Sequence, residues 1–181
     1  CLFAIGFLLM GSFVTMYNYI SFKFLEEPYA LSATIVGWIF LVYLVGTFSS
    51  AWFGSLSSKY GKQPVLYLGI IIFLAGLLLT IPGPLFMQII GLVIFTFGFF
   101  AAHSVASGWV SARATHDKAQ ASSIYLFAYY LGSSVAGTAG GYFWMKFGWS
   151  GIVGFLGCGI SLCLSCAMYI HYANCKQQAT P

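Results

Sequence analysis

The feature that most constrains this chain is a series of six long apolar runs, separated by short polar connections. The runs cover residues 1–22, 33–53, 64–81, 84–110, 119–145 and 149–172. An α-helix needs about 20 apolar residues to cross the roughly 30 Å hydrocarbon core of a bilayer. Because the runs are long and do not alternate between apolar and polar residues, they predict transmembrane helices and not barrel strands.

The composition predicts the solvent of this fold. Charged residues make up 6% of the 181 residues and hydrophobic residues 60%, whereas a soluble domain carries about 25% charged residues. So little charge cannot cover a surface that faces water, so the lipid bilayer is the expected partner. We therefore predict an all-α membrane protein, a six-transmembrane-helix bundle that forms one domain over residues 1–181, with residues 173–181 as a tail.

Other classes of partner find little support in the sequence. The seven Lys and Arg residues are spread along the chain without a cluster, which argues against nucleic acid. Cys163 and Cys166 have CxxC spacing, but no second ligand pair accompanies them, so we expect no metal and no cofactor. Cys1 stands where an initiator Met would and lies against the first apolar run, so we expect the chain to belong to something longer.

The basic residues predict the orientation in the membrane. Five of them fall in the even-numbered connections or the tail, and two in the odd-numbered connections: Lys59, Lys62, Arg113, Lys118 and Lys176 against Lys23 and Lys146. Because cytoplasmic loops are enriched in Lys and Arg, the tail is expected in the cytoplasm. None of the ten charged residues is expected deep within a span.

The second connection contains the stretch GSLSSKYGK. It resembles the loop signature G-x-L-(A/S)-D-R/K-x-G-R/K of the major facilitator superfamily, with Ser58 where the acid is expected. The positions concerned are Gly54, Leu56, Ser58, Lys59, Gly61 and Lys62. We expect Gly54 to allow close approach of helix ends, Gly61 to adopt a positive φ, and the lysines to meet helix carbonyls. An ordinary basic turn is the alternative.

The resemblance extends over the whole chain. The segment Gly11 to Ser50 is similar to the seventh and eighth helices of the YnfM-like branch, bacterial inner-membrane transporters near the drug:proton antiporters. The resemblance implies the C-terminal half of a twelve-helix transporter, with the N-terminal six-helix half and a small-molecule substrate as partners. It also implies alternating access, proton-coupled export and no enzymatic activity. In this family the first and fourth helices of a half line the cavity, and the second and fifth meet the other half.

Candidate cavity residues follow from these helix roles. They are Met10, Phe13, Thr15, Tyr17 and Asn18 on the first helix, His103, Ser104 and Ser107 on the fourth, and Tyr125 and Tyr129 on the fifth. Phenol and amide groups can hydrogen-bond a solute, although tyrosines also anchor helices at the membrane interface. His103 can carry a proton or remain neutral and bonded to a neighbouring helix.

The fifth run carries two ladders of small residues at a spacing of four. One ladder is Gly132, Ala136 and Gly140, and the other is Ser133, Gly137 and Gly141. This spacing places each ladder on one helix face, where a second helix can approach closely. Together with the helix role given above, the ladders predict contact with the other half of the transporter.

Two other functions stay open. Ser107 in the fourth run and His171 in the sixth are compatible with a rhomboid-like intramembrane protease, but the glycine pattern before the serine and a His and Asn pair in the second run are missing. A structural or regulatory membrane domain without transport is the second alternative. An aquaporin-type channel needs paired Asn-Pro-Ala segments, which the chain lacks.

Overall fold

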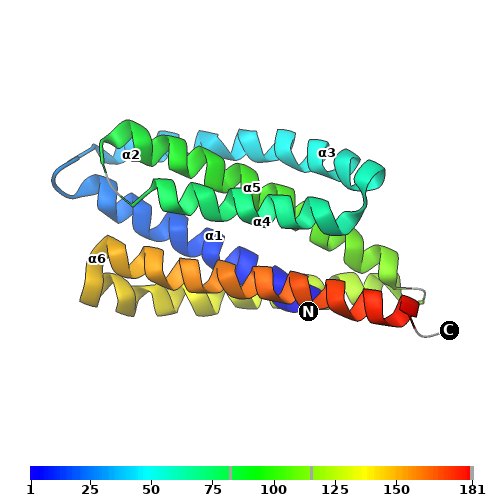
Figure 1. Cartoon of the computed structure of the whole chain (residues 1–181). Coiled ribbons are helices and arrows are strands. Elements are labelled where there is room, and N and C mark those ends of the chain that lie inside the picture. The colour runs from blue at the N-terminus through cyan, green and yellow to red at the C-terminus, as the bar shows by residue number, and fades with distance from the viewer. Residues whose placement is uncertain (82, 115, 180–181) are drawn as a thin grey trace.

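The computed structural model describes the backbone of residues 1–81, 83–114 and 116–179, and every regular element in these ranges is a helix (Figure 1). The predicted all-α fold is confirmed. The elements are α1 (Leu2–Leu25), α2 (Ala33–Trp38), η1 (Ile39–Val42), α3 (Tyr43–Tyr60), α4 (Lys62–Leu79), α5 (Leu85–Arg113) and α6 (Lys118–Ala179). Residues 180–181 of the predicted tail lie outside the described residues.

Helix α6 consists of two arms that fold back on each other (Figure 1). Gly148 interrupts the helical backbone with φ 58° and ψ −143°, a conformation that glycine adopts at little cost because it has no Cβ. We call residues 118–147 the first arm and residues 149–179 the second arm. Five helices in the described ranges are long and apolar enough to span a membrane when α2 to α3 and α6 each count as one. With its two arms counted separately, α6 accounts for the fifth and sixth predicted runs.

The observed helices extend beyond several apolar runs. Helix α3 continues through the signature stretch to Tyr60, and the hydroxyls of Ser57 and Ser58 donate to the Gly54 carbonyl inside the helix (2.8 and 3.3 Å). The second arm likewise continues to Ala179. Apolar runs mark the hydrocarbon-embedded part of a helix, so polar turns at its ends are easily missed. Conversely, the 3₁₀ segment η1 interrupts the second run, which we expected to be one continuous helix.

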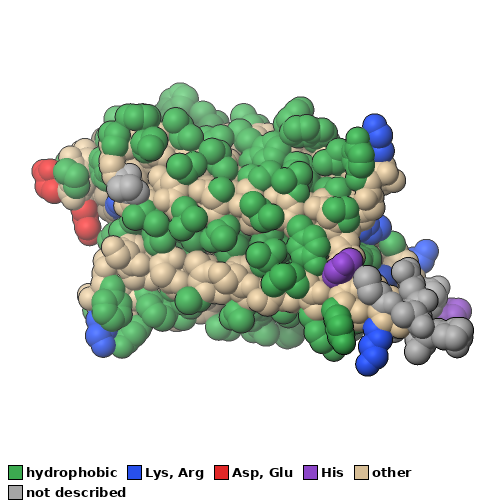
Figure 2. Space-filling view, in the orientation of Figure 1, with side chains coloured by type: hydrophobic (Ala, Val, Ile, Leu, Met, Phe, Trp, Pro, Cys, Tyr) green, Lys and Arg blue, Asp and Glu red, His purple; other side chains and the backbone are tan. Residues whose placement is uncertain are grey.

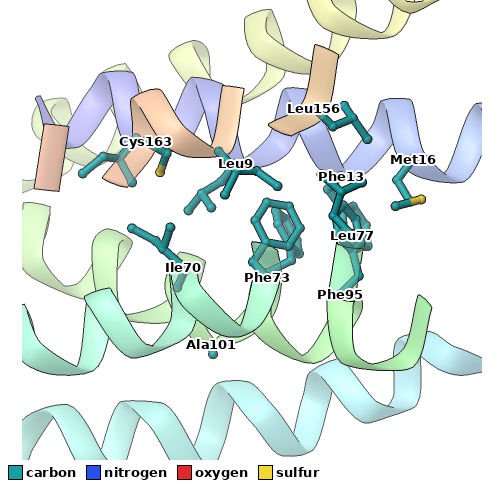
Figure 3. Close-up of a cluster of buried hydrophobic side chains, with 14 of the residues drawn as sticks. Leu9, Phe13, Met16, Ile70, Phe73, Leu77, Phe95, Ala101, Leu156 and Cys163 are labelled. Atoms are coloured by element: carbon teal, nitrogen blue, oxygen red, sulfur yellow. The ribbon is translucent and has the colours of Figure 1, made fainter. Parts of the chain in front are cut away.

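The core lies between α1, α4, α5 and the second arm of α6 (Figure 3). Its centre is formed by Leu9, Phe13 and Met16 from α1, Ile70, Phe73 and Leu77 from α4, Phe95 and Ala101 from α5, and Leu156 and Cys163 from the second arm. Phe73 and Phe95 face each other with ring centroids 4.1 Å apart. Among the five candidate spans, α1 is the most buried and the span from α2 to α3 the least.

The close packing predicted at the small-residue ladders is made with α1 of the same chain. A Cβ added at Gly132 would collide with the Phe7 carbonyl, and one added at Gly140 would lie 2.8 Å from Thr15 Cγ2. From the other side, a Cβ at Gly11 would lie 2.9 Å from Ala136 Cβ. The first ladder is thus occupied inside this chain and is not free to meet another half.

The second ladder is packed more loosely. A Cβ at Gly137 would lie 3.5 Å from Asn18 Nδ2, and one at Gly141 would lie 3.2 Å from Tyr19 Oη. In addition, the Tyr19 hydroxyl donates to the Gly137 carbonyl at 2.9 Å. Both ladders therefore pack against α1. The spacing of the small residues predicts a close neighbour but does not identify which helix it is.

This packing predicts that Gly132→Ala destabilises the bundle. The added methyl has to displace α1 backbone, so we expect a loss of about 1–3 kcal/mol, as for overpacked cores. Gly154→Ala is the matched control, because Gly154 lies in a helix and a Cβ there would meet nothing within 4 Å. Thermal unfolding in detergent should lower the midpoint for the first variant only; equal midpoints would contradict the packing.

Candidate functional site

Aromatic side chains from α1, η1, α3, α5 and the first arm of α6 meet on one side of the bundle. We call this set the aromatic face, and it comprises Phe13, Tyr17, Phe40, Tyr43, Phe100 and Tyr129. Ring centroids of Tyr17 and Tyr43 are 4.8 Å apart, those of Tyr17 and Phe40 5.7 Å, and those of Tyr43 and Phe100 6.3 Å. None of these six side chains is charged.

Some rings of the aromatic face are buried, and others are exposed at its edge. Phe13 and Tyr17 are buried, and Phe13 stacks on Phe99 with centroids 3.9 Å apart. By contrast, Phe40 is 50% exposed and Tyr43 37% exposed. A rigid base of buried rings with exposed rings at its edge is a surface that can bind an apolar or aromatic solute.

Tyr17 carries the main polar contact of this face. Its hydroxyl lies 2.7 Å from Thr96 Oγ1, and Thr96 in turn donates to the Leu92 carbonyl at 2.8 Å. Tyr17 is therefore the donor to Thr96, since the single hydroxyl proton of Thr96 is already used. This bond crosses from α1 to α5 and fixes the orientation of the Tyr17 ring.

The other predicted residues of the first helix have different environments. Thr15 is buried and donates to the Gly11 carbonyl at 2.7 Å, so its hydroxyl is used within α1. Met10 is half-buried against the core. Asn18 is exposed and lies on the side of α1 that faces Gly137.

His103 anchors a second polar cluster, between α5 and the first arm of α6. Its Nδ1 lies 3.0 Å from the Tyr125 hydroxyl, and its ring centroid is 4.7 Å from that of Tyr129. Ser104 and Ser107 donate to carbonyls one turn back in α5, those of Ala101 (3.0 Å) and Ser104 (3.2 Å). Tyr129 joins this cluster to the aromatic face.

A cavity of about 360 Å³ adjoins His103 on the side where α5 ends and α6 begins. It is lined by His103, Ser107, Gly108, Ser111, Ser122, Tyr125 and Leu126. The Ser111 and Ser122 hydroxyls lie 3.2 Å apart across it. The hydroxyls of Ser107, Ser111, Ser122 and Tyr125 thus lie beside His103 at this cavity.

Sequence reasoning missed Phe40, Tyr43, Phe100 and Thr96. The helix roles directed attention to the first, fourth and fifth runs, whereas Phe40 and Tyr43 come from the second. The 3₁₀ segment that places Phe40 beside Tyr17 had no signal in the sequence. Thr96 is recognisable only once Tyr17 is known to lie opposite it.

The signature stretch is a helix end followed by a sharp turn. Gly61 adopts φ 89°, which confirms the positive φ expected there. Lys62 Nζ donates to the Gly108 carbonyl of α5 at 3.0 Å, and Lys59 Nζ lies 5.1 Å from the Tyr60 ring centroid. A Cβ at Gly54 would meet nothing within 4 Å, so the expected close approach of helix ends there is wrong. Leu56, which lies in α3 close to Gly54, packs against the core.

Charges lie mainly at the two ends of the bundle (Figure 2). Lys59, Lys62, Arg113 and Lys118 lie where α3, α4, α5 and α6 end or begin at what we call the basic end. Glu26 and Glu27 follow α1 at the opposite end. Lys23 corrects the expectation that all charges lie in connections, because it belongs to α1 and is half-buried.

Long apolar helices with their charges mainly at the two ends of the bundle define an integral membrane protein. No group of three His, Cys, Asp or Glu side chains that could hold a metal ion occurs among the residues the structure describes. The sequence pattern of the Major Facilitator Superfamily matches residues 2–177. The chain belongs to the major facilitator superfamily of membrane transport proteins.

Curated relatives agree with this family. The chain is 53% identical over 155 residues to the uncharacterized MFS-type transporter YybF of Bacillus subtilis (strain 168), covering 86% of this chain and 38% of the relative. It is 47% identical over 170 residues to the inner membrane transport protein YnfM of Escherichia coli (strain K12), covering 94% of this chain and 41% of the relative. The chain thus spans about two fifths of these relatives, a share consistent with one half of a transporter.

The Tyr17 bond leads to a prediction about stability. Tyr17→Phe removes the donor to Thr96 and leaves the ring packing intact, so we expect a loss of about 1 kcal/mol, the usual net value of one hydrogen bond. Tyr130→Phe is the control, since Tyr130 is 61% exposed. Denaturant titration in detergent should separate the two variants; a Tyr17→Phe protein as stable as the control would show that the bond contributes nothing.

Proposed function

We propose that this chain is the C-terminal half of a secondary active transporter that moves a small solute across the bacterial inner membrane by alternating access. The observation that carries the proposal is the aromatic face, an uncharged surface of rings whose base is buried and whose edge, at Phe40 and Tyr43, is exposed. The share of the relatives that the chain covers supports the same view, because it leaves room for a second bundle of similar size.

The N-terminal half is the partner we propose for the open side. The span from α2 to α3 is the least buried of the candidate spans and contributes the exposed rings of Phe40 and Tyr43. On the other flank, the first arm of α6 presents Phe127 at 69% and Tyr130 at 61% exposure. A second bundle resting on these two flanks would enclose the aromatic face between the halves, near the membrane midplane.

The orientation is proposed from the basic end. Lys59, Lys62, Arg113 and Lys118 would lie in the cytoplasm together with the tail, as the enrichment of Lys and Arg in cytoplasmic loops suggests. The solute is proposed to be neutral or weakly amphiphilic, because the aromatic face carries phenol hydroxyls but no charge that would pair with a strongly ionic solute.

The proposed transport is export coupled to protons, with His103 as the candidate proton carrier on this chain. Titratable groups of neighbouring elements that face it are the phenols of Tyr125 and Tyr129 on α6. The cavity beside it supplies hydroxyls that can order water. Imidazole changes charge near neutral pH more readily than any other side chain, which suits a proton-coupled step.

Everted membrane vesicles provide the experiment, because a pH-sensitive dye reports proton movement whichever solute is exchanged. Energised vesicles acidify their interior, and a solute that is exchanged for protons restores the dye fluorescence. We expect aromatic, uncharged solutes from a screened library to do so with the complete transporter. Tyr43→Ala should abolish the response, since it removes an exposed wall of the aromatic face.

The control variant is Tyr142→Ala. Tyr142 is 60% exposed and contacts Phe143 and Lys146, away from the aromatic face. It should leave the response unchanged. Solute-dependent proton exchange by this chain alone, without a second half, would contradict the proposal.

A separate prediction concerns His103. His103→Gln retains a hydrogen-bonding group toward Tyr125 but cannot take up a proton at neutral pH. We expect the dye response to disappear while exchange of labelled solute across the membrane continues without a pH gradient. His171→Gln, at an exposed position on the second arm, should behave as the unmodified protein. Loss of both activities in His103→Gln would mean that His103 is structural.

A further inference from the structure

A cavity of about 750 Å³ lies at the end opposite the basic end, away from the aromatic face. It is formed where α1 ends, where α4 turns into α5 and where α6 bends at Gly148. Its lining includes the charged side chains of Lys23, Glu26 and Glu27 and the polar ones of Tyr29, Gln88 and Ser150, besides two tryptophans. Transport through the aromatic face does not use any of these groups.

Lys23 is fixed on one wall of this cavity. Its ammonium donates to Gln88 Oε1 at 2.9 Å and to the Thr80 carbonyl at 3.3 Å, and it lies 4.3 Å from the Trp149 ring centroid. Trp149 Nε1 donates to the same Thr80 carbonyl at 2.8 Å, and Gln88 is fully buried. These partners are all neutral, so the positive charge is held in place without being neutralised by them.

Glu26 and Glu27 supply the opposite charge in the same cavity. The short loop after α1 is held by backbone bonds, from Ala30 N to the Glu26 carbonyl (2.9 Å) and from Leu31 N to the Phe24 carbonyl (2.9 Å). The Tyr29 hydroxyl further ties the loop to the Gly83 carbonyl at 2.8 Å. These hydrogen bonds therefore anchor the loop that carries the two carboxylates.

The surroundings of the cavity are those of a membrane interface. Trp144 and Trp149 line it, and tryptophan is enriched at the depth of lipid headgroups. Met145 and Ile81 also line it and are 88% and 48% exposed. An exposed apolar rim beside charged walls fits a molecule with a charged head and hydrocarbon chains better than a soluble zwitterion.

We propose that this cavity binds the headgroup of a zwitterionic phospholipid with a primary ammonium group. The phosphate lies against the Lys23 ammonium and the Ser150 hydroxyl, and the lipid ammonium donates to Glu26 or Glu27. A choline headgroup cannot make these donations, because its nitrogen carries no hydrogen. A glycerol headgroup satisfies Lys23 and leaves the carboxylates without a cation.

Native mass spectrometry of the purified transporter tests this site directly. The protein is delipidated and offered equal amounts of phosphatidylethanolamine, phosphatidylglycerol and phosphatidylcholine. We expect preferential retention of one phosphatidylethanolamine. Lys23→Gln should lower this retention about tenfold, which corresponds to about 1.4 kcal/mol. Lys146→Gln is the matched control, since Lys146 lies at the same end, contacts Tyr142 and does not line the cavity.

Two further variants keep the proposal falsifiable if Lys23→Gln folds poorly. Lys23→Arg should retain phosphatidylethanolamine, because it keeps the charge. Glu26→Gln with Glu27→Gln should shift the preference toward phosphatidylglycerol. Equal loss in Lys146→Gln, or an unchanged preference in the double glutamine variant, would overturn the proposal. Neither outcome changes the solute transport that we expect, so the lipid site and the transport function can each be disproved without the other.

Discussion

The close approach of α1 to the first arm of α6 is the contact on which the rest of the structure depends. Gly132 brings the first arm against the α1 backbone, Gly140 brings it against the Thr15 and Tyr19 side chains, and Gly11 completes the contact from the α1 side. Lipid is as apolar as a leucine side chain, so helices in a membrane associate through packing of this kind and not through the hydrophobic effect. With α1 packed there, Phe13 and Tyr17 point toward α5. Phe13 stacks on Phe99, and the Tyr17 hydroxyl bonds to Thr96.

The architecture was predictable because a membrane helix needs a long apolar run, and the chain has six. Side-chain partners were less predictable. The Gly132 and Gly140 ladder indicates a close neighbour, but spacing carries no information about whether that neighbour is α1 or another half. Lys23 was expected in a loop because a charge seldom lies in a span, whereas Gln88 and the Thr80 carbonyl provide the partners that retain it in α1. Phe40 depends on the 3₁₀ segment, a departure from the helix that composition does not encode.

Three of the polar side-chain contacts between elements lie in different parts of the bundle. Tyr17 and Thr96 stiffen the base of the aromatic face, His103 and Tyr125 lie beside a hydroxyl-lined cavity, and Lys23 and Gln88 lie at the end opposite the basic end. Ring contacts through Phe13, Phe99 and Tyr129 join the first two of these three contacts. The Phe99 ring also stacks on that of His103, so the aromatic face lies in contact with the side chain that we propose as the proton carrier.

An aromatic face that binds a solute has to line an aqueous passage, whereas one without this function can face lipid. Single cysteines at Tyr43 and Tyr129, in the complete transporter with its native cysteines replaced, can be treated with a water-soluble, membrane-impermeant thiol reagent. Leu78, 50% exposed on α4, serves as the reference for a lipid-facing position. We predict that both aromatic-face cysteines react and that the one at Leu78 does not. If all three remain unreactive from both sides of the membrane, the aromatic face is turned toward lipid and the account is wrong.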